Sequence, residues 1–358
     1  MGISSLQLSI GDRAPDILGA TASGRFYSLD SQAGRPALIV ALGALEAGVA
    51  GALFERLCRL QSQLAETGVD LVPLAPMLQP FTERFSTDPA AYDLLVYTSG
   101  NEGLESLDIE GRAAAVLIDR GARIVGLSGL DAETDLIGWL GASARQIASA
   151  APRICTATAP VLMIPNIMPP ALCQALIAHF EASPHAAGVM ASFSDGAAYA
   201  KLDESKKKRR DTELTAESPL HGEVVHLLAS RVIPAIKTAF QADIANADRI
   251  LIARYDDTGG YFKRHRDNTA PHTAFREFAI SLNLNTDDYE GGELKFPEYD
   301  DHRYNPPAGG AIVFSASLLH EAAPVTKGSR YVLLSFLGSA EAQARLTAWV
   351  DSQQAIAS

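Results

Sequence analysis

The sequence predicts two domains of different fold class, a layered α/β domain followed by an α+β domain built mainly from antiparallel strands. The chain has 358 residues, 47% of them hydrophobic, which is enough for two separate cores. Strand-like and helix-like runs alternate in its first half, whereas short strand-like runs dominate beyond residue 250. All eight histidines lie at or after His179. We therefore expect imidazole chemistry in the second domain only.

The expected boundaries follow from these composition changes. We predict a first domain at residues 1–150, a short Pro-bounded linker at 151–160, a second domain at 161–340 and a helical tail at 341–358. In the first domain, apolar runs predict strands at 37–42, 69–74, 114–119 and 123–126. A run with helical spacing predicts a helix at 52–67 that stops at Gly68.

The first domain resembles a thioredoxin-fold peroxiredoxin over residues 8–145. The segment 11–16 (GDRAPD), the strand at 37–42, the helix after it and the hairpin at 116–124 carry the resemblance. A peroxiredoxin has a reactive Cys at the start of that helix, but the segment 43–51 (GALEAGVAG) contains none. Cys58 lies well inside the helix and is typical of a core thiol. We expect a non-catalytic domain that serves as scaffold, homodimer interface or partner dock.

Composition excludes several classes of protein. The net charge of -12 argues against a nucleic-acid partner, because such partners require a basic surface. The three cysteines are widely spaced and form no metal or disulfide pattern, which favours a reducing compartment. We find neither a signal peptide at the N-terminus nor a span for a membrane. The sequence predicts a cytoplasmic protein without a membrane partner.

Turn residues divide the second domain into short elements. A strand at 161–166 is followed by a helix from Pro169 to about Ala182, with proline at its start. Strands are then expected at 293–296, 311–314 and 331–337, separated by turns rich in Gly, Pro, Asn and Asp. Regularly spaced strands of this kind indicate a double-sheet jelly roll, also called a double-stranded β-helix.

A candidate metal site lies among these strands. Residues i and i+2 of a strand project to one face, so His265 and Asp267 can reach one ion while Arg266 points away. His320 follows the strand at 312–315, which we expect beside the first one, and offers the third ligand. An isolated HxD pair arises often by chance, and either histidine alone is more often a hydrogen-bonded structural residue. Together the three make a 2-His-1-carboxylate set, which leaves positions open on Fe(II).

Arg330 extends the pattern. It stands at the start of the last strand, where alternation points it inward. A buried guanidinium without a carboxylate partner is costly, so we expect it to anchor the far carboxylate of an acidic cosubstrate such as 2-oxoglutarate. The alternative for Arg330 alone is a structural salt bridge.

The second domain resembles the prolyl-hydroxylase group of Fe(II)/2-oxoglutarate dioxygenases over about residues 160–340. The resemblance rests on the segment 254–268, on the runs 281–283 and 291–294, and on His320 with Arg330 and Tyr331. It implies Fe(II), 2-oxoglutarate and O2 as cofactors, with ascorbate as a compatible auxiliary reductant, and the release of succinate and CO2. It also implies that Tyr255 hydrogen-bonds the cosubstrate carboxylate; a core aromatic is the alternative.

A cationic run stands out in this acidic chain. It comprises Lys206, Lys207, Lys208, Arg209 and Arg210. The plainer interpretation is a solvated loop. The sharper hypothesis is a mobile lid that recruits an acidic or carboxylate-bearing substrate.

The sequence thus favours an iron- and 2-oxoglutarate-dependent hydroxylase acting on an unidentified amino acid, peptide or protein. Two alternatives stay open. One is an oxygen- or redox-sensing interaction protein, in which the first domain docks a partner. The other is a mononuclear iron oxygenase that needs no 2-oxoglutarate, although Arg330 would then have no function.

Overall fold

A computed structural model describes residues 8–357 except 44, 67, 77–80, 82–90, 99–104, 106, 108–113, 131–133, 148–153 and 195–196. The chain divides into two compact units, Met1–Pro152 and Arg153–Ser358. Part of the linker predicted at 151–160 lies outside the described residues. None of the described helices is both long and apolar enough to cross a membrane.

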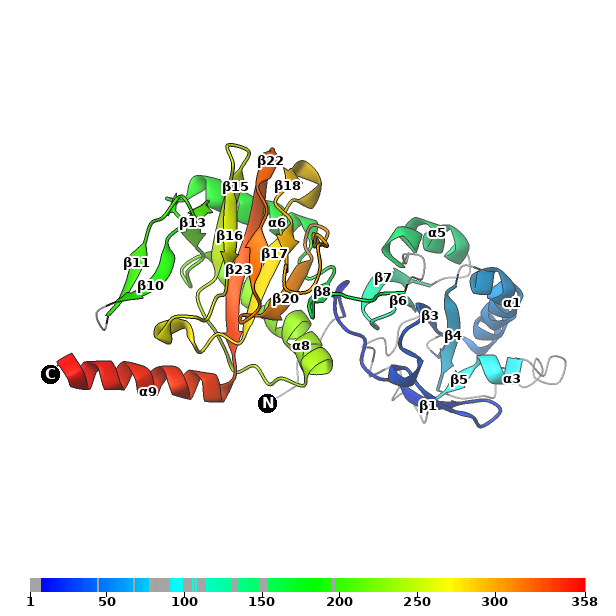
Figure 1. The fold of residues 1–358 in the computed structure, drawn as a ribbon. Helices are drawn as coiled ribbons and strands as arrows, with labels where there is room; N and C mark the ends of the chain where they lie inside the picture. Colours follow the sequence, from blue (N-terminus) through cyan, green and yellow to red (C-terminus); the bar gives the residue numbers. More distant parts are fainter. Residues whose placement is uncertain are drawn as a thin grey trace. The chain divides into compact units, whose positions relative to one another are not determined.

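The described part of the first unit contains one mixed sheet with strand order β2-β1-β5-β4-β3-β6-β7 (Figure 1). Its strands are β1 (Leu18–Thr21), β2 (Phe26–Ser28), β3 (Ala37–Ala41), β4 (Asp70–Ala75), β5 (Val96–Tyr97), β6 (Ala114–Ile118) and β7 (Ile124–Gly129). Its helices are α1 (Ala47–Glu66), α3 (Ala91–Leu94) and α5 (Leu136–Ile147), with a 3-10 turn at Asp30–Gln32. Strand β3 runs parallel to β4 and antiparallel to β6, and β4 runs parallel to β5. This is a thioredoxin fold, as predicted.

Helix α1 packs its apolar side on the sheet. Phe54 and Leu57 are fully buried there beside Leu38 and Val40 of β3. Cys58 is half-buried and packs against the same core. The helix begins at Ala47, five residues before the predicted start, and a positive φ of 76° at Gly68 follows its end.

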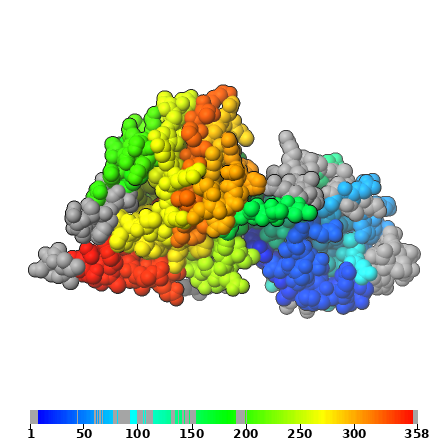
Figure 2. All heavy atoms as spheres, viewed as in Figure 1, coloured from blue at the N-terminus to red at the C-terminus, as the bar shows by residue number. Residues whose placement is uncertain are grey.

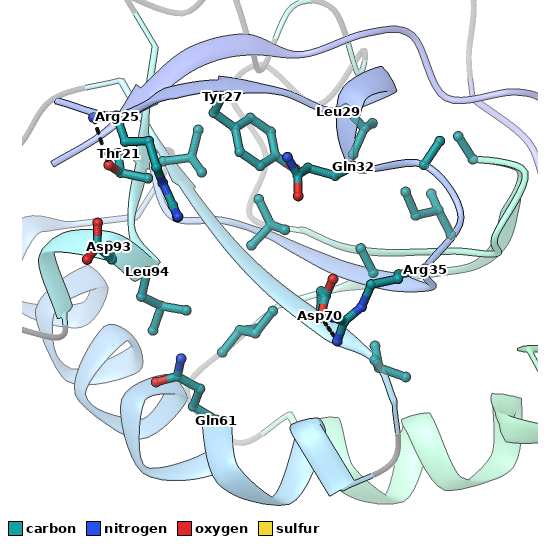
Figure 3. A pocket seen from close by; sticks show the side chains of 18 of the residues that line it. Thr21, Arg25, Tyr27, Leu29, Gln32, Arg35, Gln61, Asp70, Asp93 and Leu94 are labelled. Carbon is teal, nitrogen blue, oxygen red and sulfur yellow. Dashed lines mark hydrogen bonds and ion pairs between the residues drawn. The ribbon is translucent and has the colours of Figure 1, made fainter. Parts of the chain in front are cut away.

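The first unit has a pocket of about 400 Å³ on the sheet side that carries Tyr27 (Figure 3). Arg35 and Asp70 lie at the pocket and form an ion pair of 2.6 Å. The hydroxyl of Tyr27 is buried, and no hydrogen-bond partner for it occurs among the described residues. The lining that the structure describes contains neither His nor Cys.

The described part of the second unit contains two main sheets and two two-stranded sheets, β10-β11 and β18-β22 (Figure 1). The larger sheet has the order β8-β20-β17-β23-β15-β13-β9, with β14 paired to β23, and the smaller one β12-β16-β21-β19. The strands are β8 (Leu162–Ile164), β9 (Ala186–Ala187), β10 (Met190–Ser194), β11 (Ala197–Lys201), β12 (Lys207–Lys208), β13 (Arg210–Glu213), β14 (Asn246–Ala247), β15 (Leu251–Asp256), β16 (Tyr261–His265), β17 (Phe278–Asn283), β18 (Glu290–Gly291), β19 (Leu294–Lys295), β20 (Ala311–Ser315), β21 (His320–Ala322), β22 (Val325–Lys327) and β23 (Ser329–Gly338). The α-helices are α6 (Pro170–Ala182), α7 (Pro219–Leu227), α8 (Ile233–Phe240) and α9 (Ala340–Ala357), with a π-helical turn at Leu228–Val232 and 3-10 turns at Pro271–Thr273 and Thr286–Asp288.

Strand alternation separates the two faces of the larger sheet. Ile252 and Leu333 point to one face, where they pack with Leu176 and Phe180 of helix α6. Ala253 and Val332 point to the other face and pack with residues of the smaller sheet. The two faces therefore have separate cores, one against helices and one between sheets. This is the predicted jelly-roll arrangement.

One predicted strand neighbour is wrong. We expected the strand at 312–315 beside the strand that carries His265, but β20 pairs with β17 and β8 in the larger sheet. After β20 the chain turns and enters the smaller sheet, where β21 pairs with β16. His320 is therefore the first residue of a separate strand.

Candidate iron and 2-oxoglutarate site

A pocket of about 780 Å³ lies between the two sheets of the second unit. Strands β15, β17, β20 and β23 of the larger sheet and β16 and β21 of the smaller sheet contribute to its lining. The pocket contains all five residues that the sequence singled out for metal and cosubstrate binding: Tyr255, His265, Asp267, His320 and Arg330.

Three side chains converge on one point of this pocket. His265 ends β16 and lies opposite His320 in the β16–β21 register. Asp267 follows the strand, and its backbone N–H donates to the carbonyl of Ala316 at 2.9 Å. Its two carboxylate oxygens lie 3.4 Å from Nε2 of His265 and 3.5 Å from Nε2 of His320. Potential ligand atoms of the three residues lie within 4.8 Å of one another, so one ion can be held among them.

Backbone carbonyls set the tautomer of both imidazoles. Nδ1 of His265 lies 2.7 Å from the carbonyl oxygen of Lys263, and Nδ1 of His320 lies 3.0 Å from that of Leu318. A carbonyl only accepts, so each Nδ1 must carry the proton. The lone pair of each neutral ring is then on Nε2, which faces the carboxylate. This is the outer hydrogen bonding expected of metal-binding histidines.

Burial keeps the ligands in the ionisation state that a metal needs. It lowers the pKa of His320 to about 4, so the ring is neutral at neutral pH. Burial alone would raise the pKa of Asp267, but the two imidazoles beside it outweigh this and lower it. A neutral imidazole and a carboxylate are therefore already in place to bind a cation.

Arg330 enters the pocket from β23 and is 2% exposed. One terminal nitrogen donates to Oδ1 of Asn283 at 3.0 Å and to Oγ of Ser281 at 3.3 Å. Its Nε is buried and has no hydrogen-bond partner among the described residues. A buried guanidinium with an orphaned donor fits the far carboxylate of 2-oxoglutarate. No role was predicted for Ser281 or Asn283, although their alternation on β17 places both on the face that carries Arg330's partners.

Tyr255 is 3% exposed and contacts two arginines. Its ring centroid lies 5.4 Å from the guanidinium carbon of Arg330 and 5.6 Å from that of Arg209. Its hydroxyl accepts a hydrogen bond of 2.9 Å from Arg209. Tyr255 is thus placed beside Arg330, and both the core-aromatic role and the cosubstrate role are compatible with this position.

The cationic run 206–210 is largely strand and not the solvated loop of the plainer interpretation, while the recruitment of an acidic substrate by this run stays a prediction. Lys207 and Lys208 form β12 and pair with β16, while Arg210 begins β13 and pairs with β15. In Figure 2 green atoms of the second unit, the colour of the chain near residue 200, border the yellow atoms of residues near 250. Lys206, Lys207 and Arg209 line the pocket, whereas Lys208 and Arg210 are outside its described lining. The pairings with β16 and β15 place the run along one wall of the pocket.

Aromatic rings surround the histidines and were not predicted. Phe262 stacks on His265 with ring centroids 3.4 Å apart, and Phe314 meets His320 edge to face at 4.7 Å. These rings restrict the imidazoles to one orientation and limit the access of water. Aromatic residues at alternating positions of the strands that carry or flank metal-ligand candidates are the sequence signal that could have predicted these contacts.

Comparisons with known proteins agree with this geometry. Residues 250–338 match the family model described as the 2OG-Fe(II) oxygenase superfamily. A PKHD-type hydroxylase of Picosynechococcus sp. is 32% identical over 143 residues, which cover 39% of this chain and 63% of that relative. The chain thus spans somewhat less than two thirds of the relative's length.

Solved structures match each unit separately. A prolyl-4-hydroxylase of Pseudomonas putida aligns with 51% of this chain and 93% of its own, at 19% identity and a TM-score of 0.40. The thioredoxin domain of a thiol-disulfide oxidoreductase from Bacteroides vulgatus aligns with 37% of this chain and 98% of its own, at 19% identity and a TM-score of 0.31. Residues 250–338 of the C-terminal unit thus match a 2OG-Fe(II) oxygenase domain, with PKHD-type hydroxylases among the relatives, and the N-terminal unit has a thioredoxin-like fold.

Proposed function

We propose that this chain is an Fe(II)- and 2-oxoglutarate-dependent hydroxylase that oxidises an amino acid, a peptide or a protein. The observation that carries the proposal is that three ligating side chains and an orphaned buried guanidinium share one pocket. The first set suits Fe(II), and the second suits an acidic cosubstrate. An iron oxygenase that does not use 2-oxoglutarate has no need for the guanidinium.

His265, Asp267 and His320 would hold the iron. Bound iron and 2-oxoglutarate supply the oxygen-activating chemistry, with succinate and CO2 as the products of the cosubstrate. The carbonyls of Lys263 and Leu318 keep the two Nε2 atoms directed at the metal position. Phe262 and Phe314 each cover part of one imidazole and restrict the access of water to it, which protects a reactive site from side reactions.

Arg330 would bind the far carboxylate of 2-oxoglutarate. Its Nε and its terminal nitrogens present donors, while Asn283 and Ser281 hold the guanidinium in place. Tyr255 accepts from Arg209 and keeps its own hydroxyl proton for donation, so it can bind the same carboxylate. The protein thus orients the cosubstrate from the end that does not react.

Release of succinate from 2-oxoglutarate, with Fe(II) and O2 supplied, tests the proposal. We expect turnover in the wild-type protein, none in His265→Ala, and a strongly raised KM for 2-oxoglutarate in Arg330→Ala. His302→Ala, which removes an exposed histidine outside the described lining of the pocket, is the matched control and should behave as wild type. Absence of both 2-oxoglutarate binding and succinate from the wild-type protein would refute the function.

A further inference from the structure

The pocket of the second unit has a strongly positive lining in a chain whose net charge is -12. Among the described residues that line it, nine are Lys or Arg and only two, Asp267 and Glu321, are acidic. Several of the cations are paired with carboxylates, for example Arg266 with Glu298 and Arg276 with Asp248. A ligand can bind only to cations whose N–H donors are not all used by such partners.

Arg209 is the most deeply placed cation apart from Arg330. Its side chain is 8% exposed, and its guanidinium carbon lies 5.6 Å from the ring centroid of Tyr255 and 5.9 Å from that of Phe262. Nε and one terminal nitrogen contact the carboxylate of Asp211 at 2.7 and 3.1 Å, and the other terminal nitrogen donates to Tyr255. A guanidinium has five N–H donors; the terminal nitrogens use two of them, and Nε, although close to Asp211, makes no hydrogen bond, so three are left among the described residues. Asp211 fixes the group and leaves donors free.

Lys207 adds a second buried cation to this cluster. It is 4% exposed, and its ammonium donates to the carbonyl of Val189 at 2.7 Å and lies 3.5 Å from Asp211. The ammonium also lies 5.2 Å from the ring centroid of Phe262. One carboxylate thus serves two buried cations, and the cluster retains one net positive charge when Lys207 is protonated. A buried charge without a counterion is unfavourable.

The cosubstrate does not supply that counterion. With Fe(II) and the two carboxylates of 2-oxoglutarate bound, the charges of Asp267 and Arg330 balance them. The positive charge shared by Lys207 and Arg209 therefore remains for another ligand. Both side chains are almost fully buried, so only a group that enters the pocket can reach them.

We propose that Lys207 and Arg209 bind an anionic group, a carboxylate or a phosphate, of the substrate that is oxidised. The substrate class is then a small organic anion that enters the pocket, and not a neutral peptide segment. This inference rests on the proposed function, because it assigns the substrate end of the same pocket. Two neighbouring cations fixed by one carboxylate and two aromatic rings form a preorganised anion site.

Calorimetric binding to the full chain tests the proposal without turnover. The protein is loaded with Zn(II) and saturated with 2-oxoglutarate, which occupies Arg330, and is then titrated with three probes. These are N-acetylglycine, phenyl phosphate and the neutral N-acetylglycinamide. We expect one of the two anions to bind at least about tenfold more tightly than the amide, since hydrogen bonds to charged groups contribute that much. The tighter anion identifies the chemical group.

Two variants assign the effect to the cluster. Lys207→Met removes the net charge and leaves the Arg209–Asp211 pair intact; Arg209→Gln also removes the net charge and leaves Asp211 paired with Lys207. Each is expected to lose most of the preference for the anion. The matched controls are Lys208→Met and Arg210→Gln, which lie in the same run but bind Thr258 and His185 outside the described pocket lining.

The inference is overturned by equal binding of anions and amide, or by an anion preference that survives in both variants. The proposed function fails differently, by absence of 2-oxoglutarate binding in the first step of the same titration. If 2-oxoglutarate binds but neither anion is preferred, only the substrate assignment is wrong.

Discussion

The charged side chains of the two pockets differ in how deeply they are buried and in how completely they are paired. In the first unit, Arg35 and Asp70 form an ion pair whose arginine is 64% exposed, and an exposed pair of this kind needs no ligand. In the second unit, Arg330 is 2% exposed and keeps an orphaned Nε, and Arg209 is 8% exposed with donors to spare. Charges that are buried and incompletely paired indicate a ligand, whereas charges at a surface do not.

The first unit also shows that a single buried polar atom without a hydrogen-bond partner is weak evidence for a ligand site. The Tyr27 hydroxyl has no hydrogen-bond partner among the described residues, but a neutral hydroxyl costs much less to bury than an ion. The second unit combines a convergent ligand set with unpaired cations in one cavity. The difference predicts that equivalent substitutions in the two pockets have very unequal effects.

The largest expected effect comes from a comparison of one acidic residue in each pocket. Asp267→Asn removes the single anionic ligand of the proposed metal site and should weaken Fe(II) binding more than about a hundredfold, since changes in outer hydrogen bonds alone cost 10- to 100-fold. Asp70→Asn in the first unit should leave metal binding unchanged. Anaerobic titration with Fe(II) measures both. Comparable losses in the two variants would break the contrast between the pockets.

The second effect concerns pH. Burial, followed by the charge of Arg209, lowers the pKa of Lys207 to about 7, whereas an unfolded lysine titrates near 10.4. Between these values the unfolded chain binds more protons, so the contribution of Lys207 to stability rises with pH. Relative to Lys207→Met, the wild type should gain about 2 kcal/mol in free energy of unfolding from pH 7 to 9. Urea unfolding at several pH values measures the difference, and a constant difference would contradict the burial of this ammonium.

The same titration has a consequence for the proposed anion site. As pH rises through about 7, Lys207 loses its charge, so anion binding should weaken. A substrate anion stabilises the charged ammonium and moves this transition to higher pH. Neutral probes should show no such dependence.

A smaller effect is expected from a backbone position beside Arg330. Gly292 has a φ of 72°, and a Cβ there would lie 2.8 Å from Cδ of Arg330. Gly292→Ala should therefore cost about 1–2 kcal/mol for the left-handed backbone and also displace Arg330, weakening 2-oxoglutarate binding several-fold. Gly259→Ala is a matched control, because it has a φ of 93° and no atom within 4 Å of the added Cβ. Equal 2-oxoglutarate affinities in the two variants would show that Arg330 does not depend on this contact.

Alternation along strands is the sequence signal that predicted most of the site. It placed His265 and Asp267 together and directed Arg330 inward, and the structure has both features. It could not predict which strand carries His320. The chain passes from the larger to the smaller sheet between β20 and β21, and this change depends on strand register across the whole domain. It also failed for Lys207 and Arg209, since five consecutive cations resemble a solvated segment. Their burial depends on Asp211, Tyr255 and Phe262, which no local pattern links to them.

The smallest effect is predicted for the thiol of the first unit. Cys58 lies inside α1 and packs against the core, away from the helix start where a helix N-terminus lowers a thiol pKa. Cys58→Ala should cost about 1 kcal/mol or less and leave the rate of hydrogen peroxide reduction at the uncatalysed level, as in the wild type. Stopped-flow peroxide consumption measures the rate, with Cys173→Ala as the comparison, because burial raises the pKa of Cys173 to about 11 and keeps it a thiol. Peroxide reduction that depends on Cys58 would give the first unit a chemistry of its own, and the contrast between a non-catalytic first unit and a catalytic second unit would no longer hold.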